Sequence, residues 1–345
     1  MRKDTITGRS FTADFLEPYR QVGDLAADRV IEVVAAQGRH EAVGSLMRFL
    51  TDYEDFAWEG QPEAVQEFIR SQDQFPGTLD QQKFDQGIAF FWRHYRLISW
   101  LLGTYSLPYC YAGVNGAQVL WISERIKNNT FQRLEETGAF VLGIMQEADW
   151  PSGRNFLRIA KIRLLHAAIR WFTLRSGRWN DTWGYPICQE DMAATNLSFS
   201  YIAIKGLRKL SVSVSNQEEE SFLHFWNVVG ELLGVAPALL PQNMLEAYRL
   251  EKSISARQFR SSEAGRGLTR SLLKAIERQI SSPSLQNAPA AQMRYFLGEP
   301  VANLLDIPEV EWEERFVKLA LQVPLFPRLL SLQKPASPVL ERYWR

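Results

Sequence analysis

Residues 153–175, GRNFLRIAKIRLLHAAIRWFTLR, decide the fold of this chain. Their apolar side chains occupy more than one face of a helix, which is typical of a helix that is buried on most sides. The stretch nevertheless holds six basic residues and no acidic residue. Because a buried guanidinium group without a partner costs roughly several kcal/mol, the anions must come from elsewhere. The basic residues are Arg154, Arg158, Lys161, Arg163, Arg170 and Arg175.

Three of the polar residues share one stripe of this helix. Arg163, His166 and Arg170 are spaced i, i+3 and i+7, which places them on one face. A cofactor with a metal ion and two carboxylates fits that arrangement. Haem b offers an iron for the histidine and two propionates that the flanking arginines can bind in a bidentate manner.

Two simpler interpretations of the stripe compete with a haem site. His166 is equally compatible with a core histidine whose nitrogens are satisfied by protein groups. The arginines, in turn, can be partly exposed or can pair with acidic residues shortly downstream, namely Asp181, Glu190 or Asp191. Spacing alone favours these simpler interpretations.

Helical periodicity extends outward from this stretch in both directions. Residues 15–33 and 41–56 carry apolar residues at helical spacing, and Thr78-x-x-Gln81 resembles a capping box that opens a helix to about Leu102. Further helices are expected over 116–147, from Ser152 to before Gly177, from after Pro186 to about Leu210, and from the Ser215-x-x-Glu218 capping box to Gly234. Two or three more follow Pro241, and the proline-rich tail from Pro324 is expected to pack as an irregular strap. No alternating run suggests a sheet, so the predicted fold class is all-α.

Composition limits the classes of function. Basic and acidic residues balance at 39 each, which gives no global field for nucleic acid or an anionic membrane. The two cysteines form no CxxC or CxxCH motif, which disfavours a disulfide framework, a cysteine zinc site and covalent haem. No HExxH, Walker, GxGxxG or GxSxG signature occurs. No signal peptide, twin arginine or transmembrane stretch is recognisable, so we expect a cytoplasmic protein.

Several segments together resemble one known family. Arg163-x-x-His166-x-x-x-Arg170 is followed by WGYPICQEDM at 183–192 and by Phe199. Two more segments, SLPYCYA at 106–112 and EEESFLHFWNVVGELLG at 218–234, match in order and spacing. The region from about Phe75 to Pro241 thus resembles the rubber oxygenase (latex-clearing protein) and MpaB-type oxygenase family.

This resemblance implies a fold and a cofactor. Members of the family have an all-helical, globin-like core and bind haem b through a proximal histidine. The resemblance implies that role for His166. It places Arg163 and Arg170 near the propionates or in a position to orient the ligand, and Arg294 near the haem.

The resemblance also identifies a distal side. Arg133 and Thr137 match an arginine and a threonine that face the haem in rubber oxygenases, although an exposed arginine with a helix-bonded threonine is the simpler interpretation. Rubber oxygenases have a lysine before that threonine, where this chain has Glu136. Capping of the iron by a lysine is therefore not carried over. Glu136 either borders the pocket, as a proton acceptor for an allylic carbon, or belongs to a solvated Glu135–Glu136 pair.

The predicted function is a haem-b-dependent oxygenase. It would act on an apolar, unsaturated or isoprenoid-like small molecule, with dioxygen bound at the iron opposite His166. The alternative is a non-catalytic haem or hydrophobic-ligand binding protein, a carrier or a sensor. We expect an N-terminal helical addition (1–74), a haem-binding core (75–262) and C-terminal helices with the tail (263–345) in one structural domain. The oligomeric state is left open.

Overall fold

The computed structural model describes residues 8–52, 55–123, 125–280 and 286–310, and helices dominate these ranges. Their only β pairing is an isolated bridge between Gly113 and Phe259. The all-α prediction is therefore confirmed. None of the described helices is both long enough and apolar enough to cross a membrane.

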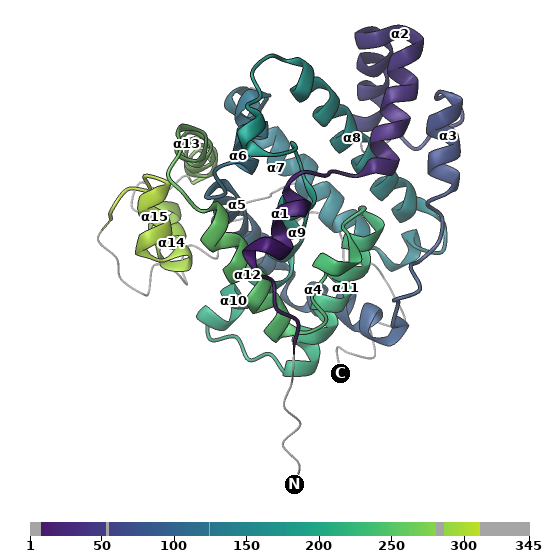
Figure 1. The fold of residues 1–345 in the computed structure, drawn as a ribbon. Coiled ribbons are helices and arrows are strands. Elements are labelled where there is room, and N and C mark those ends of the chain that lie inside the picture. Colours follow the sequence, from purple (N-terminus) through teal and green to yellow (C-terminus); the bar gives the residue numbers. More distant parts are fainter. Residues whose placement is uncertain (1–7, 53–54, 124, 281–285, 311–345) are drawn as a thin grey trace.

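The N-terminal helices pack on the basic helix that dominates the sequence. After α1 (Ala13–Arg20) come α2 (Leu25–Thr51) and α3 (Glu63–Arg70), and α2 lies along α8 (Arg154–Arg175), as Figure 1 shows at its upper right. Ile31 and Val34 of α2 share a buried cluster with Leu164 and Ala168 of α8. The N-terminal addition thus forms one wall around the central helix.

The N-terminal helix boundaries differ from those expected from the two apolar patterns at 15–33 and 41–56. The stripe over residues 15–33 is interrupted between α1 and α2, where Asp24 caps α2 by accepting a hydrogen bond from the N–H of Ala27. In turn, α2 continues without a break into the second predicted pattern and ends at Thr51. An aspartate at an N-cap is a strong start signal that apolar spacing alone does not reveal.

The next helices form a second wall. They are α4 (Gln81–Leu101), a π-helical turn η1 (Leu102–Ser106), α5 (Leu107–Tyr111), α6 (Gly116–Ile122) and α7 (Arg125–Ile144), followed by the 3-10 turn η2 (Glu147–Asp149). Asp80, and not Thr78, caps α4, while Thr78 donates to Glu231. Pro108 lies in the first turn of α5, where a missing N–H costs little, and the chain stays helical from η1 into α5. The single helix expected over 116–147 is two helices.

Past α8 the chain covers the remaining sides. It forms η3 (Asp181–Trp183), α9 (Gln189–Phe199), α10 (Tyr201–Lys209), α11 (Asn216–Leu232) and η4 (Pro237–Leu239). The predicted capping box of Ser215 and Glu218 is confirmed. Gly153, with a φ of 78°, precedes α8 in place of the predicted cap Ser152. The helix expected to reach Leu210 is divided at Ser200.

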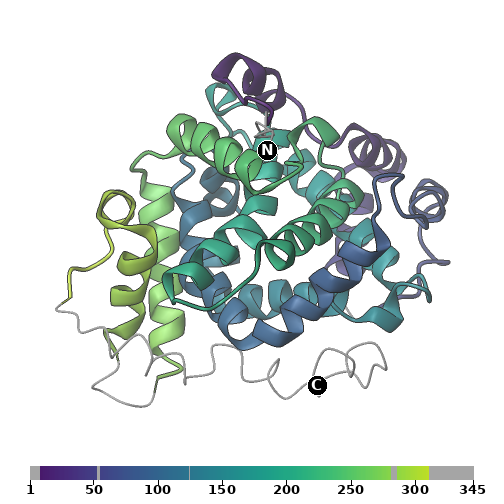
Figure 2. The same cartoon turned by 90° about the horizontal axis from the view of Figure 1, so that it is seen from below.

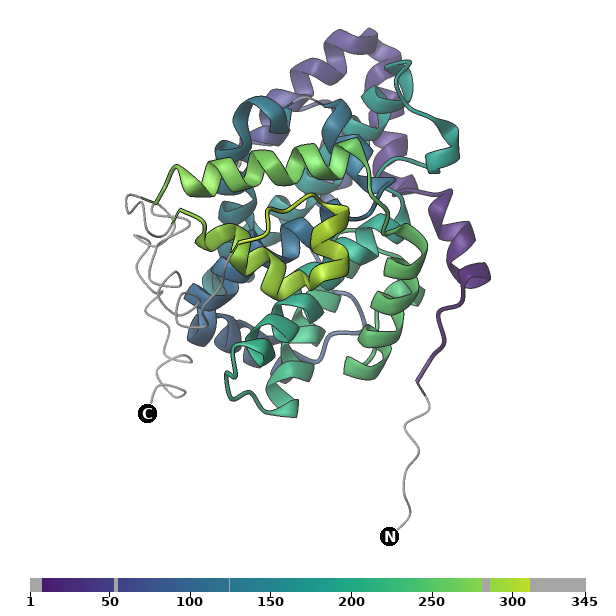
Figure 3. The same cartoon turned by 90° about the vertical axis from the view of Figure 1, so that its left-hand side faces the viewer.

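The C-terminal described helices are α12 (Met244–Gln258), α13 (Glu263–Glu277), α14 (Ala288–Leu297) and α15 (Glu299–Leu304). Figure 3 shows α13, α14 and α15 grouped on one face, where they share a second buried cluster with residues of α5 and α6. Seen from below, α4 and α11 lie side by side in the main cluster (Figure 2). The tail from Pro324 lies outside the described residues.

Candidate functional site

A cavity of about 1400 Å³ lies between α7, α8 and α9, with further walls from α4, η1, α5, α11 and α12. It exceeds the roughly 300–1000 Å³ typical of small-molecule pockets. Four of the residues predicted to form the haem site border it: Arg133, Glu136, Thr137 and His166. The structure therefore brings the predicted proximal and distal residues, from different helices, to one cavity.

His166 projects from the middle of α8, and its side chain borders the cavity. Its Nδ1 atom is buried and has no hydrogen-bond partner among the described residues, so the interpretation as a satisfied core histidine lacks support. Burial, followed by the positive charges of Arg170 and Arg133, lowers the imidazole pKa to about 4. His166 is thus neutral at pH 7, and a neutral imidazole is the form that ligates a metal.

The cavity-facing side of α7 carries a local polar network. Arg133 Nη1 donates to Glu136 Oε2 over 2.9 Å, and Thr137 Oγ1 donates to the carbonyl of Arg133 over 3.0 Å. Gln132 donates to the other carboxylate oxygen of Glu136 over 3.1 Å. Thr137 is therefore helix-bonded, as the simpler interpretation held, but it also borders the cavity.

The two arginines that flank His166 bind protein carboxylates. Arg163 Nε and Nη2 contact the two oxygens of Asp24 over 2.6 and 2.9 Å, and Arg170 Nε contacts Asp28 over 2.6 Å. Both arginines are buried, and neither borders the cavity. The partners are thus acidic residues at the start of α2, more than 130 residues upstream, and not the downstream acids considered above. The signal that was missed is the pair of acids four residues apart at the beginning of an apolar helix.

Arg294 lies in α14, away from the cavity-bordering residues. It donates to the carbonyl of Ile307 over 2.6 Å and to Asn303 over 2.9 Å, and it forms an ion pair with Glu299. These contacts join α14 to α15 and the chain that follows. They give no support to a position near a cofactor.

Other residues border the cavity that the sequence did not identify as cavity residues, although Asp191 was considered as an arginine partner and Phe199 belongs to the family resemblance. Asp191, Thr195 and Ser198 on α9 form a polar wall, and Phe199 stacks on Trp226 with ring centroids 4.8 Å apart. The described residues contain no group of three or more His, Cys, Asp or Glu side chains placed to hold a metal ion. A haem would require no such group, because a single protein side chain suffices to ligate its iron.

Comparisons with known proteins agree with this architecture. The family "ER-bound oxygenase mpaB/B'/Rubber oxygenase, catalytic domain" matches residues 92–325. Rubber oxygenase from Streptomyces sp. (strain K30) is 24% identical over 323 residues, which are 92% of this chain and 79% of the relative. Among solved structures, latex clearing protein LCP in the closed state superposes with a TM-score of 0.74 at 22% identity, covering 94% of this chain and 90% of that chain. The chain therefore belongs to the MpaB and rubber oxygenase family and is an oxygenase.

Proposed function

We propose that this oxygenase depends on haem b and that His166 is the protein ligand to the iron. The observation that carries the proposal is a neutral imidazole at the cavity wall, with a buried nitrogen that no described protein group satisfies. The cavity is also larger than a substrate alone requires, which leaves room for a macrocycle and a co-substrate. The residues present thus fit the group that the family resemblance implies.

When bound, haem supplies the iron that activates dioxygen; the protein supplies orientation and an environment of low polarity. His166 holds the group on the side of α8. Arg163 and Arg170 fix α8 against α2 through Asp24 and Asp28, so we infer a positioning role for them in place of the expected contact with propionates. Of the arginines in the predicted site, Arg133 alone borders the cavity and can contact a propionate there.

On α7, Thr137 and Glu136 border the cavity and are the groups proposed to act on the reactants. Thr137 can donate a hydrogen bond into the cavity by turning its hydroxyl away from the Arg133 carbonyl. Glu136 is the carboxylate that can accept a proton from an allylic carbon of the substrate. Both roles are proposals for the side of the cavity opposite His166.

The proposed substrate is an apolar, unsaturated, isoprenoid-like small molecule. Ile162, Leu165 and Ile169 surround His166 on the cavity face of α8 and would contact an apolar chain. The named relatives are rubber oxygenases, which supports a substrate with carbon–carbon double bonds. A non-catalytic carrier would bind the same ligand without consuming oxygen, so measured oxygen uptake with an alkene separates the two functions.

Replacement of His166 by alanine tests the cofactor. We expect the parent protein to be purified with haem b that acidified organic solvent extracts, and His166→Ala to lose most of it, measured as the pyridine haemochrome. His94→Ala is the matched control, because His94 is half-buried against Phe90 on α4 and does not border the cavity. A colourless parent after reconstitution, or equal haem contents in the two variants, would contradict the proposal.

A further inference from the structure

The cavity face of α9 differs in character from the apolar face of α8. Asp191, Thr195 and Ser198 follow one another at steps of four and three residues and border the cavity. Thr195 Oγ1 donates its proton to the carbonyl of Asp191 over 2.9 Å, and Ser198 Oγ donates to that of Thr195 over 2.7 Å. Because both protons are engaged within the helix, these side chains offer acceptor lone pairs to the cavity.

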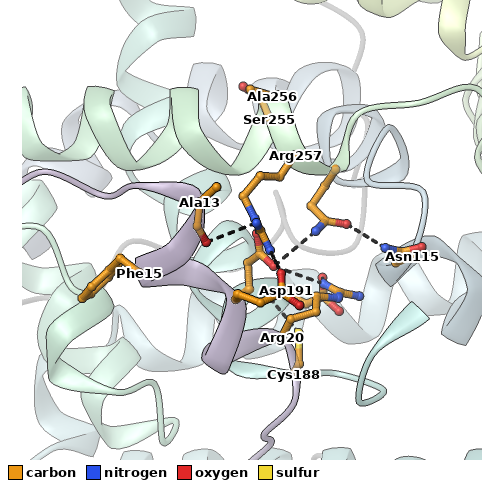
Figure 4. Close-up of polar contacts among 12 residues, drawn as sticks. Ala13, Phe15, Arg20, Asn115, Cys188, Asp191, Ser255, Ala256 and Arg257 are labelled. Atoms are coloured by element: carbon orange, nitrogen blue, oxygen red, sulfur yellow. Dashed lines mark hydrogen bonds and ion pairs between the residues drawn. The ribbon is translucent and has the colours of Figure 1, made fainter. Parts of the chain in front are cut away.

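The carboxylate of Asp191 is held in place by residues from distant parts of the chain. Arg20 on α1 donates from Nη1 to Asp191 Oδ1, and the Arg20 Nε donates to the carbonyl of Trp183 over 2.9 Å (Figure 4 labels Arg20 and Asp191). The absent side chain of Gly116 makes room for the carboxylate, since a Cβ there would lie 3.1 Å from Asp191 Oδ1. The carboxylate is therefore fixed before any ligand arrives.

One acceptor and one donor in this group have no partner among the described residues. They are Asp191 Oδ2 and Arg20 Nη2, and both atoms are buried. A buried polar atom without a hydrogen bond costs free energy that a suitable ligand group recovers on binding. Asp191 borders the cavity and Arg20 does not, so a ligand group that donates a hydrogen bond matches the free acceptor, Asp191 Oδ2.

The charge of the surroundings selects among such groups. Arg20 and Arg257 pair with Glu190 and Asp191, and the Arg257 Nε donates to Glu190 over 2.9 Å. Figure 4 labels Arg20, Asp191 and Arg257. Arg257 also pairs with Glu17, so both cations beside Asp191 are already engaged by carboxylates and neither is left for a ligand carboxylate or phosphate at this wall. Other basic residues that border the cavity, among them Arg133, Arg154 and Lys161, belong to α7 and α8. Asp191 itself would repel an anion. A neutral hydroxyl group needs no cation as a partner and is not repelled by the Asp191 carboxylate.

We propose that this wall of α9, with Asp191 as its main acceptor, binds the hydroxyl group of an alcohol whose apolar chain lies along α8. The inference deepens the proposed function by naming the substrate class, an unsaturated apolar alcohol. It needs neither haem nor turnover to be tested, because it concerns binding alone.

Farnesol, its methyl ether and farnesoic acid test the proposal as matched ligands. Their affinities are measured by displacement of Nile red from the protein. The measurement is made on haem-loaded and on haem-free protein, in both cases in the absence of oxygen. We expect farnesol to bind at least tenfold more tightly than the ether, which cannot donate, and than the acid, which is charged. In Asp191→Asn, the affinity for farnesol should exceed the affinity for the ether and for the acid by about threefold or less.

Two threonines supply a control that does not depend on the folding of the Asp191 variant. Thr195→Val should weaken farnesol binding at least threefold, because the Thr195 hydroxyl, which donates to the Asp191 carbonyl without ligand, can turn and donate to the oxygen of the bound alcohol. Thr51→Val should leave it unchanged, because Thr51 also borders the cavity and bonds the carbonyl one turn back over 2.8 Å, but lies at the end of α2. Equal affinity of the parent for farnesol and its ether would overturn the proposal, as would equal effects of the two threonine variants. A haem-loaded protein that fails to discriminate overturns this inference alone, whereas a protein that discriminates but never binds haem contradicts only the cofactor proposal.

Discussion

At the scale of single residues, the ion pairs that Arg163 and Arg170 of α8 make with Asp24 and Asp28 determine where His166 can lie. Arg163 contacts both oxygens of Asp24 in the two-donor geometry of a guanidinium, and Arg170 contacts Asp28 one turn further along α2. Both arginines are on the same helix as His166 but face α2. The acid-free stretch is thus balanced by acids on its neighbouring helix, and the position of His166 depends on that match.

Removing Arg163 is expected to destabilise the protein and to affect haem only through α8. Arg163→Leu leaves Asp24 buried without its partner, which should lower the free energy of unfolding by about 3–5 kcal/mol in urea titrations. Arg163→Lys should restore it only in part, because an ammonium lacks the planar fork. Asp24→Asn, which retains the cap of α2, distinguishes the two roles. If the ion pair positions α8, Asp24→Asn should weaken haem retention as Arg163→Leu does. If Arg163 binds a propionate directly, Asp24→Asn should leave haem retention unchanged.

Thr137 is expected to influence oxygen chemistry and not haem content. Thr137→Val removes a hydroxyl that borders the cavity, and the loss of one hydrogen bond should change the rate of oxygen consumption by about two- to tenfold. Thr104→Val is the control, since Thr104 makes the same bond to the carbonyl one turn back, over 2.9 Å, away from the cavity. Equal rates in the parent and Thr137→Val would show that this part of α7 does not contact the reactants.

The sequence revealed the site in part because its signals are local. The stripe of Arg163, His166 and Arg170 and the spacing of Arg133 and Thr137 can be read from helical geometry, and His166, Arg133, Glu136 and Thr137 do border one cavity. The partners of the arginines and the wall around Asp191 depend on contacts between helices far apart in the chain. Helical spacing within one segment carries no information about such pairs.

At the scale of helices, the contact between α4 and α11 is the most extensive in the structure and depends on a close approach. A Cβ at Gly87 would lie 2.6 Å from the Cβ of Phe225 and 2.7 Å from the carbonyl oxygen of Ser221. Because neither atom is the end of a flexible side chain, the two helices would have to move apart. Gly87 is thus required by packing and not by a turn.

Alanine at two glycines should therefore change stability in opposite directions. Gly87→Ala should lower the free energy of unfolding by about 1–3 kcal/mol through overpacking. Gly44→Ala, in the interior of α2 with no atom within 4 Å of the added Cβ, should raise it by about 0.5–1 kcal/mol. Chemical denaturation of both variants measures the difference, and a stabilising Gly87→Ala would contradict the observed packing.

The helix boundaries show what periodicity can and cannot predict. The capping box at Ser215 and the end of α8 before Gly177 follow from local chemistry, and the structure confirms both. The break between α6 and α7 and the division at Ser200 lack a proline or glycine in the sequence. Packing between helices decides such breaks, so a single segment does not reveal them.

At the scale of the whole molecule, the N-terminal segment joins the start of the described chain to α12 and α9. Arg9 binds Glu246 on α12 through its backbone N–H over 2.9 Å and through its side chain over 2.7 and 2.9 Å. Further along, Arg20 binds Asp191 on α9, beside the cavity. The segment from Arg9 to Arg20 therefore links α12 and α9, and its attachment supports the wall proposed to bind a hydroxyl group.

This attachment should be sensitive to acid. Burial would raise the pKa of Glu246, but hydrogen bonds from the Arg9 side chain, with the backbone N–H groups of Gln242 and Arg9, outweigh burial and hold the pKa below its ordinary value of 4.5. A carboxylate whose pKa is lower in the folded state stabilises the protein above its unfolded pKa, and the contribution is lost as the pH falls through the folded value. We expect Arg9→Ala to cost about 1–3 kcal/mol at pH 7 and progressively less below pH 4.5, measured by urea unfolding across that range. A difference between the parent and Arg9→Ala that stays constant down to strong acid would show that Arg9 contributes by packing on Phe11, over which its guanidinium lies at 5.4 Å, and not by binding Glu246.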